Sequence, residues 1–149
     1  MYYSGNVGNF YATYPVQSPV EVYSIEKDSW ESLKDCNLPP LKWPGVCVFN
    51  SKEEPKKKLI FIVGGKICDL GPHHSLSDKS FILDLSTNDV EVCAPPITTR
   101  FNPSVFYDPD VNKIILFGGE DDKYRLAPVI EMFDLKTRQW SEVATIPVS

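Results

Sequence analysis

The sequence lacks the features that mark membrane, secreted and zinc-binding proteins. Its longest apolar run, Leu59–Val63, is far shorter than the roughly 20 apolar residues of a membrane-spanning helix. The start of the chain, Met1–Gly5, has neither the basic residues nor the apolar core of a signal peptide. The four cysteines form no Cys-x-x-Cys pair and fit no usual zinc spacing. We therefore expect a cytoplasmic protein with no membrane contact and no cofactor; in a secreted chain the four cysteines could pair in three ways.

Positive charge is scarce as well. Lys and Arg number 15 against 20 Asp and Glu, which gives a net charge of −5 at pH 7. Nucleic-acid-binding proteins usually carry a basic face, because neutralising phosphates supplies much of their affinity. The one basic run, Lys56–Lys58, follows two glutamates and a proline and is predicted to be a solvated turn. A nucleic-acid partner is therefore not expected.

Apolar and turn-forming residues are plentiful. The chain of 149 residues is 42% hydrophobic and 12% aromatic, which is enough for a core of ordinary domain size. Its 13 prolines and 8 glycines occur in short clusters, which suits many short strands joined by turns better than long helices. The composition predicts a globular protein built from strands.

A strand–turn–strand pattern occurs three times without gaps. In each copy a polar turn separates two apolar segments, and proline follows soon after the second segment. Because proline cannot donate to a strand ladder, these prolines mark loops that end a sheet. The copies are Val22–Trp30, Ile82–Val90 and Met132–Trp140, in which Tyr23, Leu83 and Phe133 align.

A second landmark is an apolar run that ends in two glycines. Leu59–Gly65 matches Ile114–Gly119, and such a run predicts a buried strand that ends in a tight bend. Because the runs are continuously apolar rather than alternating, both faces of each sheet are expected to be covered. Residues Met1–Asn6 form a weaker copy, with Gly5 at the position of the second glycine.

The combined pattern resembles the Kelch motif, which has an apolar strand, Gly-Gly, a variable loop, a strand ending in aromatic-Asp-Leu, and a Trp. The third copy matches best, with Ile114–Gly119, Phe133–Leu135 and Trp140. The second copy has Val90 at the Trp position, and the first has Ser24 at the Asp position. The resemblance covers nearly the whole chain.

The resemblance implies an all-β fold: a partial Kelch-type β-propeller of about three four-stranded antiparallel blades. Residues 1–149 would form a single Kelch-repeat region, with blade portions roughly at 1–35, 45–93 and 103–143. Within a blade, strands a to d run from the inner to the outer edge. We expect Val46–Phe49 and Ser104–Tyr107 as strand a; Leu59–Val63 and Ile114–Phe117 as b; Val20–Ile25, Ser80–Leu85 and Ile130–Leu135 as c; and Trp30–Leu33, Val90–Cys93 and Trp140–Val143 as d.

Three blades do not close a ring, because propellers usually have 4–8. Two uncovered sheet faces would remain, and apolar faces of that size favour association. Two explanations stay open. The chain is part of a longer polypeptide or a short divergent form, or copies self-associate so that two arcs close the propeller.

The resemblance implies a non-enzymatic protein–protein interaction module that presents its d–a and b–c loops to a partner protein or peptide. These loops are residues 36–45 and 94–103 (d–a) and 66–79 and 120–129 (b–c). Arg100 stands at the family's usual basic position, and the matching position of the earlier blade is near Lys42. Aromatic residues and arginine carry much of the binding energy of interfaces. The candidate partner-binding residues are Lys42, Trp43, Arg100, Phe101, Asn102, Lys123, Tyr124 and Arg125.

Two structural interpretations of these residues, without any partner, also stay open. Phe101 could pack between loops, and Asp121 and Asp122 could screen the charges of Lys123 and Arg125. The alternative function is a Kelch-type enzyme or carbohydrate-binding protein that acts on a small sugar or a metal cofactor. Its support is slight, since the sequence contains no recognisable catalytic motif. The possible metal ligands are on one loop: Cys68, Asp69, His73, His74 and Asp78.

Overall fold

The structure is a computed structural model, and it describes residues 20–33, 36–67 and 75–147. All regular elements in these ranges are β-strands, as predicted. Within the same ranges there is no helix long and apolar enough to cross a membrane. The N-terminal copy at Met1–Asn6 and the loop residues Cys68, Asp69, His73 and His74 lie outside the described residues.

Two four-stranded antiparallel sheets form the bulk of the fold. Each is a meander in which every strand pairs with the next strand of the same sheet. The strands a to d expected for the second and third blades are found within a residue or two of their predicted positions. The first sheet contains β4 (Gly45–Asn50), β5 (Lys58–Val63), β7 (Ser80–Asp84) and β8 (Val90–Cys93), and the second contains β9 (Ser104–Asp108), β10 (Lys113–Phe117), β11 (Val129–Asp134) and β12 (Gln139–Thr145).

Two smaller elements complete the description. The hairpin of β1 (Val20–Ser24) and β2 (Ser29–Leu33) corresponds to strands c and d of the first expected blade. A short ribbon pairs β3 (Leu41–Lys42) with β6 (Lys66–Ile67) and joins a d–a loop to a b–c loop. This ribbon was not predicted, because two-residue strands carry no periodicity that a sequence could reveal.

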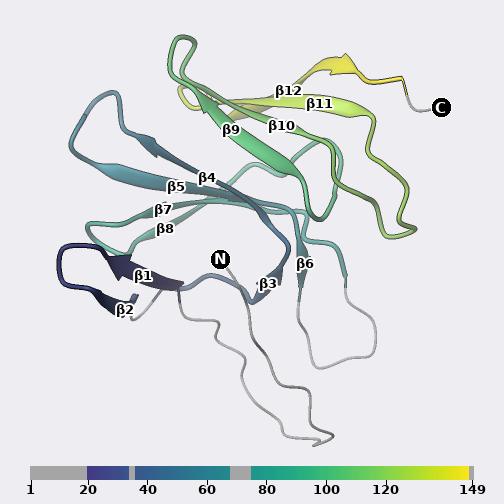
Figure 1. The fold of residues 1–149 in the computed structure, drawn as a ribbon. Coiled ribbons are helices and arrows are strands. Elements are labelled where there is room, and N and C mark those ends of the chain that lie inside the picture. Colours follow the sequence, from purple (N-terminus) through teal and green to yellow (C-terminus); the bar gives the residue numbers. More distant parts are fainter. Residues whose placement is uncertain (1–19, 34–35, 68–74, 148–149) are drawn as a thin grey trace, which may run out of the picture.

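The two large sheets lie face to face, as Figure 1 shows, and the first core cluster fills the space between them. Phe61 and Ile82 of the first sheet are buried with Leu116 and Phe133 of the second. The other face of the first sheet packs against residues 20–33 and 36–41 through a second cluster. Each sheet therefore packs against the one before it, and the fold is an arc of a propeller.

One apolar face of the arc is only partly covered by described residues. Phe61 and Val63 of the first sheet are fully buried against the second sheet. Counted from the paired glycines, their equivalents in the second sheet are Ile115 and Phe117, which are half-buried. On this same face Phe106 is 46% exposed and packs edge-on against Phe117. The second sheet thus presents to solvent the surface that the first sheet buries.

The c–d turns show why the repeats can differ in sequence at the aspartate position. Asp84 and Asp134 each accept a backbone N–H two residues further on through Oδ1, at 2.9 and 2.8 Å. In the first copy the Oγ of Ser24 accepts the N–H three residues on at 3.3 Å. Side-chain acceptors of this kind stabilise tight turns. A serine at the aspartate position therefore retains a weaker form of the same turn.

Candidate functional site

The paired glycines bring each b strand against its own d–a loop. A Cβ on Gly65 would lie 2.8 Å from the carbonyl oxygen of Lys42, and a Cβ on Gly119 would lie 2.7 Å from that of Phe101. Both glycines also have positive φ, +92° and +80°. Only glycine permits this approach, so the paired glycines hold the d–a and b–c loops together at this end of the arc. We call the surface that these loops form the mouth. Because the second glycine of each pair makes the same contact, Lys42 and Phe101 occupy equivalent positions in the two repeats.

The next pair of equivalent positions is Trp43 and Asn102, and both have φ of 53°. The N–H of Asn102 donates to the carbonyl of Trp43 at 2.7 Å, which connects the two loops. Asparagine tolerates the left-handed region, whereas a bulky residue there is unusual and strained. Trp43 is thus held in a conformation that its own residue type disfavours.

A lysine ammonium lies among three aromatic rings at this mouth. The Nζ of Lys66 is 3.8 Å from the ring centroid of Phe101, 4.5 Å from that of Tyr124 and 5.7 Å from that of Trp43. The same Nζ donates to the Tyr124 hydroxyl at 3.4 Å. Lys66 is 8% exposed, whereas Trp43 and Tyr124 are 56% and 69% exposed. We call these four residues the aromatic cage; it joins the two repeats and exposes two of its rings.

A second lysine stands beside the cage. Lys42 and Lys66 face each other in the register of the β3–β6 ribbon, and the Lys42 side chain is exposed. In the described ranges no carboxylate lies within 4 Å of either ammonium group. Like charges directly opposite each other destabilise a strand pair. The mouth therefore holds two neighbouring lysines that no carboxylate of the described ranges pairs with.

In the turn that carries Tyr124, Asp121 neutralises the positive charge of Arg125. Arg125 pairs with Asp121 at 2.6 Å, and Asp121 also accepts the backbone N–H of Lys123 at 2.8 Å. The hydrogen bonds from the Arg125 backbone and side chain hold the pKa of Asp121 at about 2, well below its usual range. Asp121 thus stays ionised and screens Arg125, as the sequence had suggested. Lys123 is exposed beside them.

Arg100 is not available at the mouth. Its side chain is fully buried and forms an ion pair with Glu131, which is also fully buried. Its Nη1 donates to the carbonyl oxygens of Gly118 at 3.1 Å and Val129 at 2.9 Å. A guanidinium with these partners connects three segments of one sheet. The partner-facing role predicted for Arg100 needs an exposed surface, which this side chain lacks; its role is structural.

The first sheet replaces this ion pair with two apolar side chains. Because Lys42 aligns with Phe101, the residue equivalent to Arg100 is Leu41, one position before the expected Lys42. The residue equivalent to Glu131 is Phe81. Leu41 and Phe81 are buried together in the second core cluster. The basic position predicted for the earlier repeat therefore does not exist as a charged site.

Comparison with known proteins places these repeats in a family. A family model described as the Kelch motif matches residues 112–147, and a model described as recombination activating protein 2 matches residues 26–94. Together with the two diglycine strands and the four-stranded sheets, these matches support a Kelch-type propeller. The Kelch resemblance predicted from the paired glycines and the aspartate turns is thereby confirmed.

The matches to individual relatives cover only part of each relative's length. The Kelch chain is 29% identical over 100 residues to human V(D)J recombination-activating protein 2, which is 59% of this chain and 18% of that protein. It is 25% identical over 124 residues to the chicken protein of the same name, covering 75% of this chain and 21% of that protein. The Kelch chain thus spans about a fifth of the length of these relatives.

A solved structure shows the same fold. A fungal alcohol oxidase of the AA5 family, determined in complex with copper, superposes with a TM-score of 0.58 at 19% identity. The match covers 72% of the Kelch chain and 23% of the oxidase. At this identity the likeness concerns the fold alone. Within the described ranges no group of three or more potential metal ligands gathers.

The Kelch mouth brings most of the predicted site residues together. Phe101 is buried as the base of the cage, as its packing alternative had proposed, and Asn102 supports Trp43. Sequence reasoning missed Lys66, although its position directly after the paired glycines was a usable signal, because the next repeat has Glu120 there. The predicted residues found at the mouth are Lys42, Trp43, Phe101, Asn102, Lys123, Tyr124 and Arg125.

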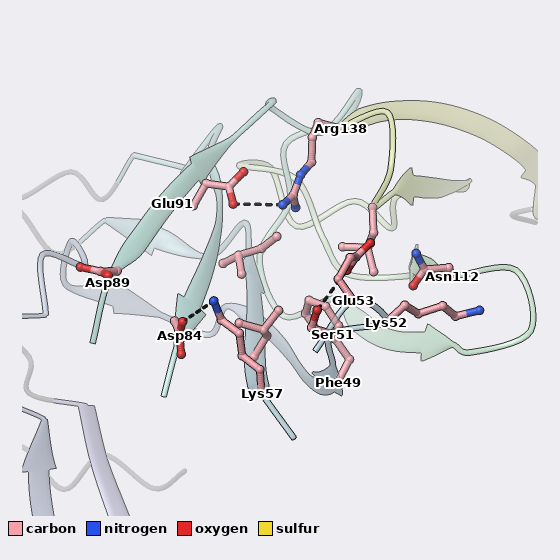
Figure 2. A pocket seen from close by; sticks show the side chains of 13 residues that line it. Phe49, Ser51, Lys52, Glu53, Lys57, Asp84, Asp89, Glu91, Asn112 and Arg138 are labelled. Atoms are coloured by element: carbon pink, nitrogen blue, oxygen red, sulfur yellow. Dashed lines mark hydrogen bonds and ion pairs between the residues drawn. The ribbon is translucent and has the colours of Figure 1, made fainter. Parts of the chain in front are cut away.

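A cavity of about 280 Å³ lies at the a–b and c–d turns, away from the mouth. Figure 2 shows Arg138 directed toward Glu91 of the other sheet and Lys57 directed toward Asp84. These ion pairs measure 3.1 and 2.8 Å. Much of the charge around the cavity is therefore already paired, and the mouth remains the stronger candidate site.

Proposed function

We propose that this Kelch chain is a non-enzymatic interaction module whose mouth docks a partner protein or peptide. The observation that carries the proposal is Trp43. Its ring is more than half exposed, and its backbone has a positive φ that the next repeat assigns to Asn102. Strained residues that the surrounding structure holds in place concentrate at functional sites. Exposed tryptophan is also a residue type that dominates interface energies.

The cage supports this proposal because its rings already pack against one another without a partner. Tyr124 packs edge-on against Phe101, with ring centroids 5.6 Å apart, and Trp43 packs on the same ring at 5.9 Å. Rings that are already positioned lose little conformational freedom on binding. The proposal places the module in the cytoplasm and assigns it no nucleic-acid or membrane partner.

Affinity capture with a matched pair of variants tests the proposal. Trp43→Asn installs the residue of the equivalent position, so the backbone is retained while the ring is lost. Trp30→Asn removes another exposed tryptophan, 68% exposed in β2. Proteins bound by the wild type and the Trp30 variant, but absent with Trp43→Asn, would support the mouth. Identical protein sets from both variants would contradict it.

A further inference from the structure

Two apolar surfaces at opposite ends of the arc are only partly covered by described residues. The β1–β2 hairpin forms one end and the second sheet forms the other, with the first sheet between them (Figure 1). We propose that these two end faces bind each other between copies of the chain, so that the hairpin of one copy packs on the second sheet of the next. The partner that fits this surface is a second copy of the chain.

The hairpin carries an aromatic pair that the arc repeats in its interior. Phe133 and Trp140 lie opposite each other on β11 and β12, with ring centroids 5.2 Å apart and ring planes at 51°. Tyr23 and Trp30 are their equivalents on β1 and β2, with ring centroids 5.2 Å apart and ring planes at 49°. The hairpin therefore presents the same packed pair of rings as the second sheet.

Inside the arc, this pair is covered by a side chain of the preceding sheet. The ring centroid of Phe61 lies 5.1 Å from that of Phe133 and 6.0 Å from that of Trp140, and Phe133 is fully buried. On the hairpin, Tyr23 and Trp30 are 42% and 68% exposed. The hairpin rings thus stay open to solvent at positions where their equivalents accept a phenylalanine.

The exposed hairpin face points away from the first sheet. Val20 and Leu33 pair in register and pack on the first sheet through the second core cluster. Because successive residues of a strand alternate between faces, Tyr23 lies on the opposite face from Val20. Ile25, which follows β1, is 86% exposed, whereas its equivalent Leu135 packs against the first core cluster. A contiguous apolar face of this kind marks an interaction surface.

The second sheet carries the surface that complements this hairpin face. Counted from the paired glycines, Ile115 is the equivalent of Phe61. Ile115 is half-buried and pairs in register with Phe106, which is 46% exposed on the same face. In the proposed contact, Ile115 of one copy covers Tyr23 and Trp30 of the next, as the first sheet covers the equivalent rings inside the arc. The interface already present within the chain is the template for the contact between copies.

Two copies joined in this way should form a closed pair. A contact between two different surfaces runs head to tail, and it makes a ring where the rotation closes. Each copy contributes one hairpin and two four-stranded sheets, which correspond to three blades. Two copies supply six, within the usual 4–8 blades of propellers. No residue of the aromatic cage belongs to this contact, so the inference is independent of the proposed function.

Sedimentation velocity of the full chain tests the pairing. The wild type should form a species of twice the mass of one chain, and its fraction should rise with concentration. Trp30→Lys and Phe106→Lys each place a lysine in both contacts of the ring, so each should raise the dissociation constant by roughly tenfold or more. Trp43→Asn removes an exposed tryptophan of the mouth instead and should keep the wild-type constant. Circular dichroism checks the fold of each variant, and Tyr23→Lys takes the place of a Trp30→Lys protein that does not fold.

Mixing the two lysine variants distinguishes head-to-tail pairing from other association. Each variant alone has a lysine in both contacts, whereas a mixed pair has both lysines in one contact and none in the other. The mixture should therefore associate more tightly than either variant alone. A wild-type chain that stays monomeric, a Trp30→Lys variant that associates like the wild type, or a mixture no tighter than its components would overturn the proposal. Masses that rise beyond two chains with concentration would overturn the closed pair.

Discussion

Arg100 and Glu131 form an ion pair in which neither side chain is exposed to solvent. Glu131 also accepts the backbone N–H groups of Ile97 at 2.7 Å and Thr98 at 3.0 Å. The pair therefore fastens the d–a loop to the third strand of the second sheet. In the first sheet, Leu41 and Phe81 fill the equivalent positions without any charge.

Replacing Arg100 alone should be much more damaging than replacing both partners. Arg100→Leu leaves the Glu131 carboxylate buried without its cation, which typically costs about 3–5 kcal/mol of unfolding free energy. Arg100→Leu with Glu131→Phe copies the first sheet and should recover part of that loss. Recovery should be incomplete, because backbone groups of the loop lose partners worth about 1–3 kcal/mol each. Urea denaturation measures both values, and a single variant as stable as the wild type would disprove the structural role of Arg100.

Trp43→Asn should separate binding from stability. Relief of left-handed strain contributes about 1–2 kcal/mol, and loss of the ring costs about 0.5–2 kcal/mol in contacts with Lys66 and Phe101. These effects oppose each other, so the unfolding free energy should change by less than about 1 kcal/mol. Asn102→Val, a β-branched residue at the same φ, is the contrasting variant and should destabilise. A strongly destabilised Trp43→Asn would show that the ring serves the fold.

Much of the fold could be predicted because its signals are local. The paired glycines at Gly65 and Gly119 and the turn aspartates Asp84 and Asp134 each act within a few residues of themselves. Their spacing therefore placed all eight strands of the two large sheets. The β3–β6 ribbon could not be predicted, because its pairing depends on how two loops meet in space.

The site was harder to predict for the same reason. Trp43 and Tyr124 could be found because they are aromatic residues in the loops that the Kelch resemblance exposes. The burial of Arg100 depends on Glu131, which lies on another strand, and only alignment of Glu131 with Phe81 would have revealed a core position. Lys66 was missed because two of the three rings around its ammonium group, Phe101 and Tyr124, belong to the next repeat.

The two glycines of one motif should respond differently to alanine. A Cβ at Gly118 meets no atom within 4 Å, so Gly118→Ala should cost about 1 kcal/mol from its φ of +63° alone. A Cβ at Gly119 would lie 2.7 Å from a backbone carbonyl oxygen that cannot move freely. Gly119→Ala should therefore cost about 1–3 kcal/mol more. Thermal or urea unfolding of the two variants checks which one loses more unfolding free energy. Equal losses would show that the d–a loop shifts to make room for the methyl group at position 119.

Stability should fall in acid through Asp84. Burial raises the pKa of this carboxyl group, but the Lys57 ammonium at 2.8 Å and the Ser86 hydroxyl lower it by more, so the folded-state pKa lies below the ordinary value of about 3.9. A depressed pKa adds stability above the unfolded-state value, and this contribution is lost as the pH falls from about 4 toward the folded-state value. Asp84→Asn should therefore lose less unfolding free energy between about pH 5 and pH 2.5 than the wild type. Asp122→Asn, in an exposed turn, is the control that should keep the wild-type slope.

Self-association should depend on the uncovered face of the second sheet. Phe106, Ile115 and Phe117 occupy the surface that the first sheet buries against its neighbour, so a second copy that closes the propeller would cover them. We expect a mass above that of one chain at high protein concentration, and a monomer after Phe106→Lys, because a buried unpaired lysine opposes the contact. Val111→Lys, at an exposed turn residue, should leave the mass unchanged. A wild-type chain that stays monomeric by light scattering at high concentration would exclude closure by a second copy.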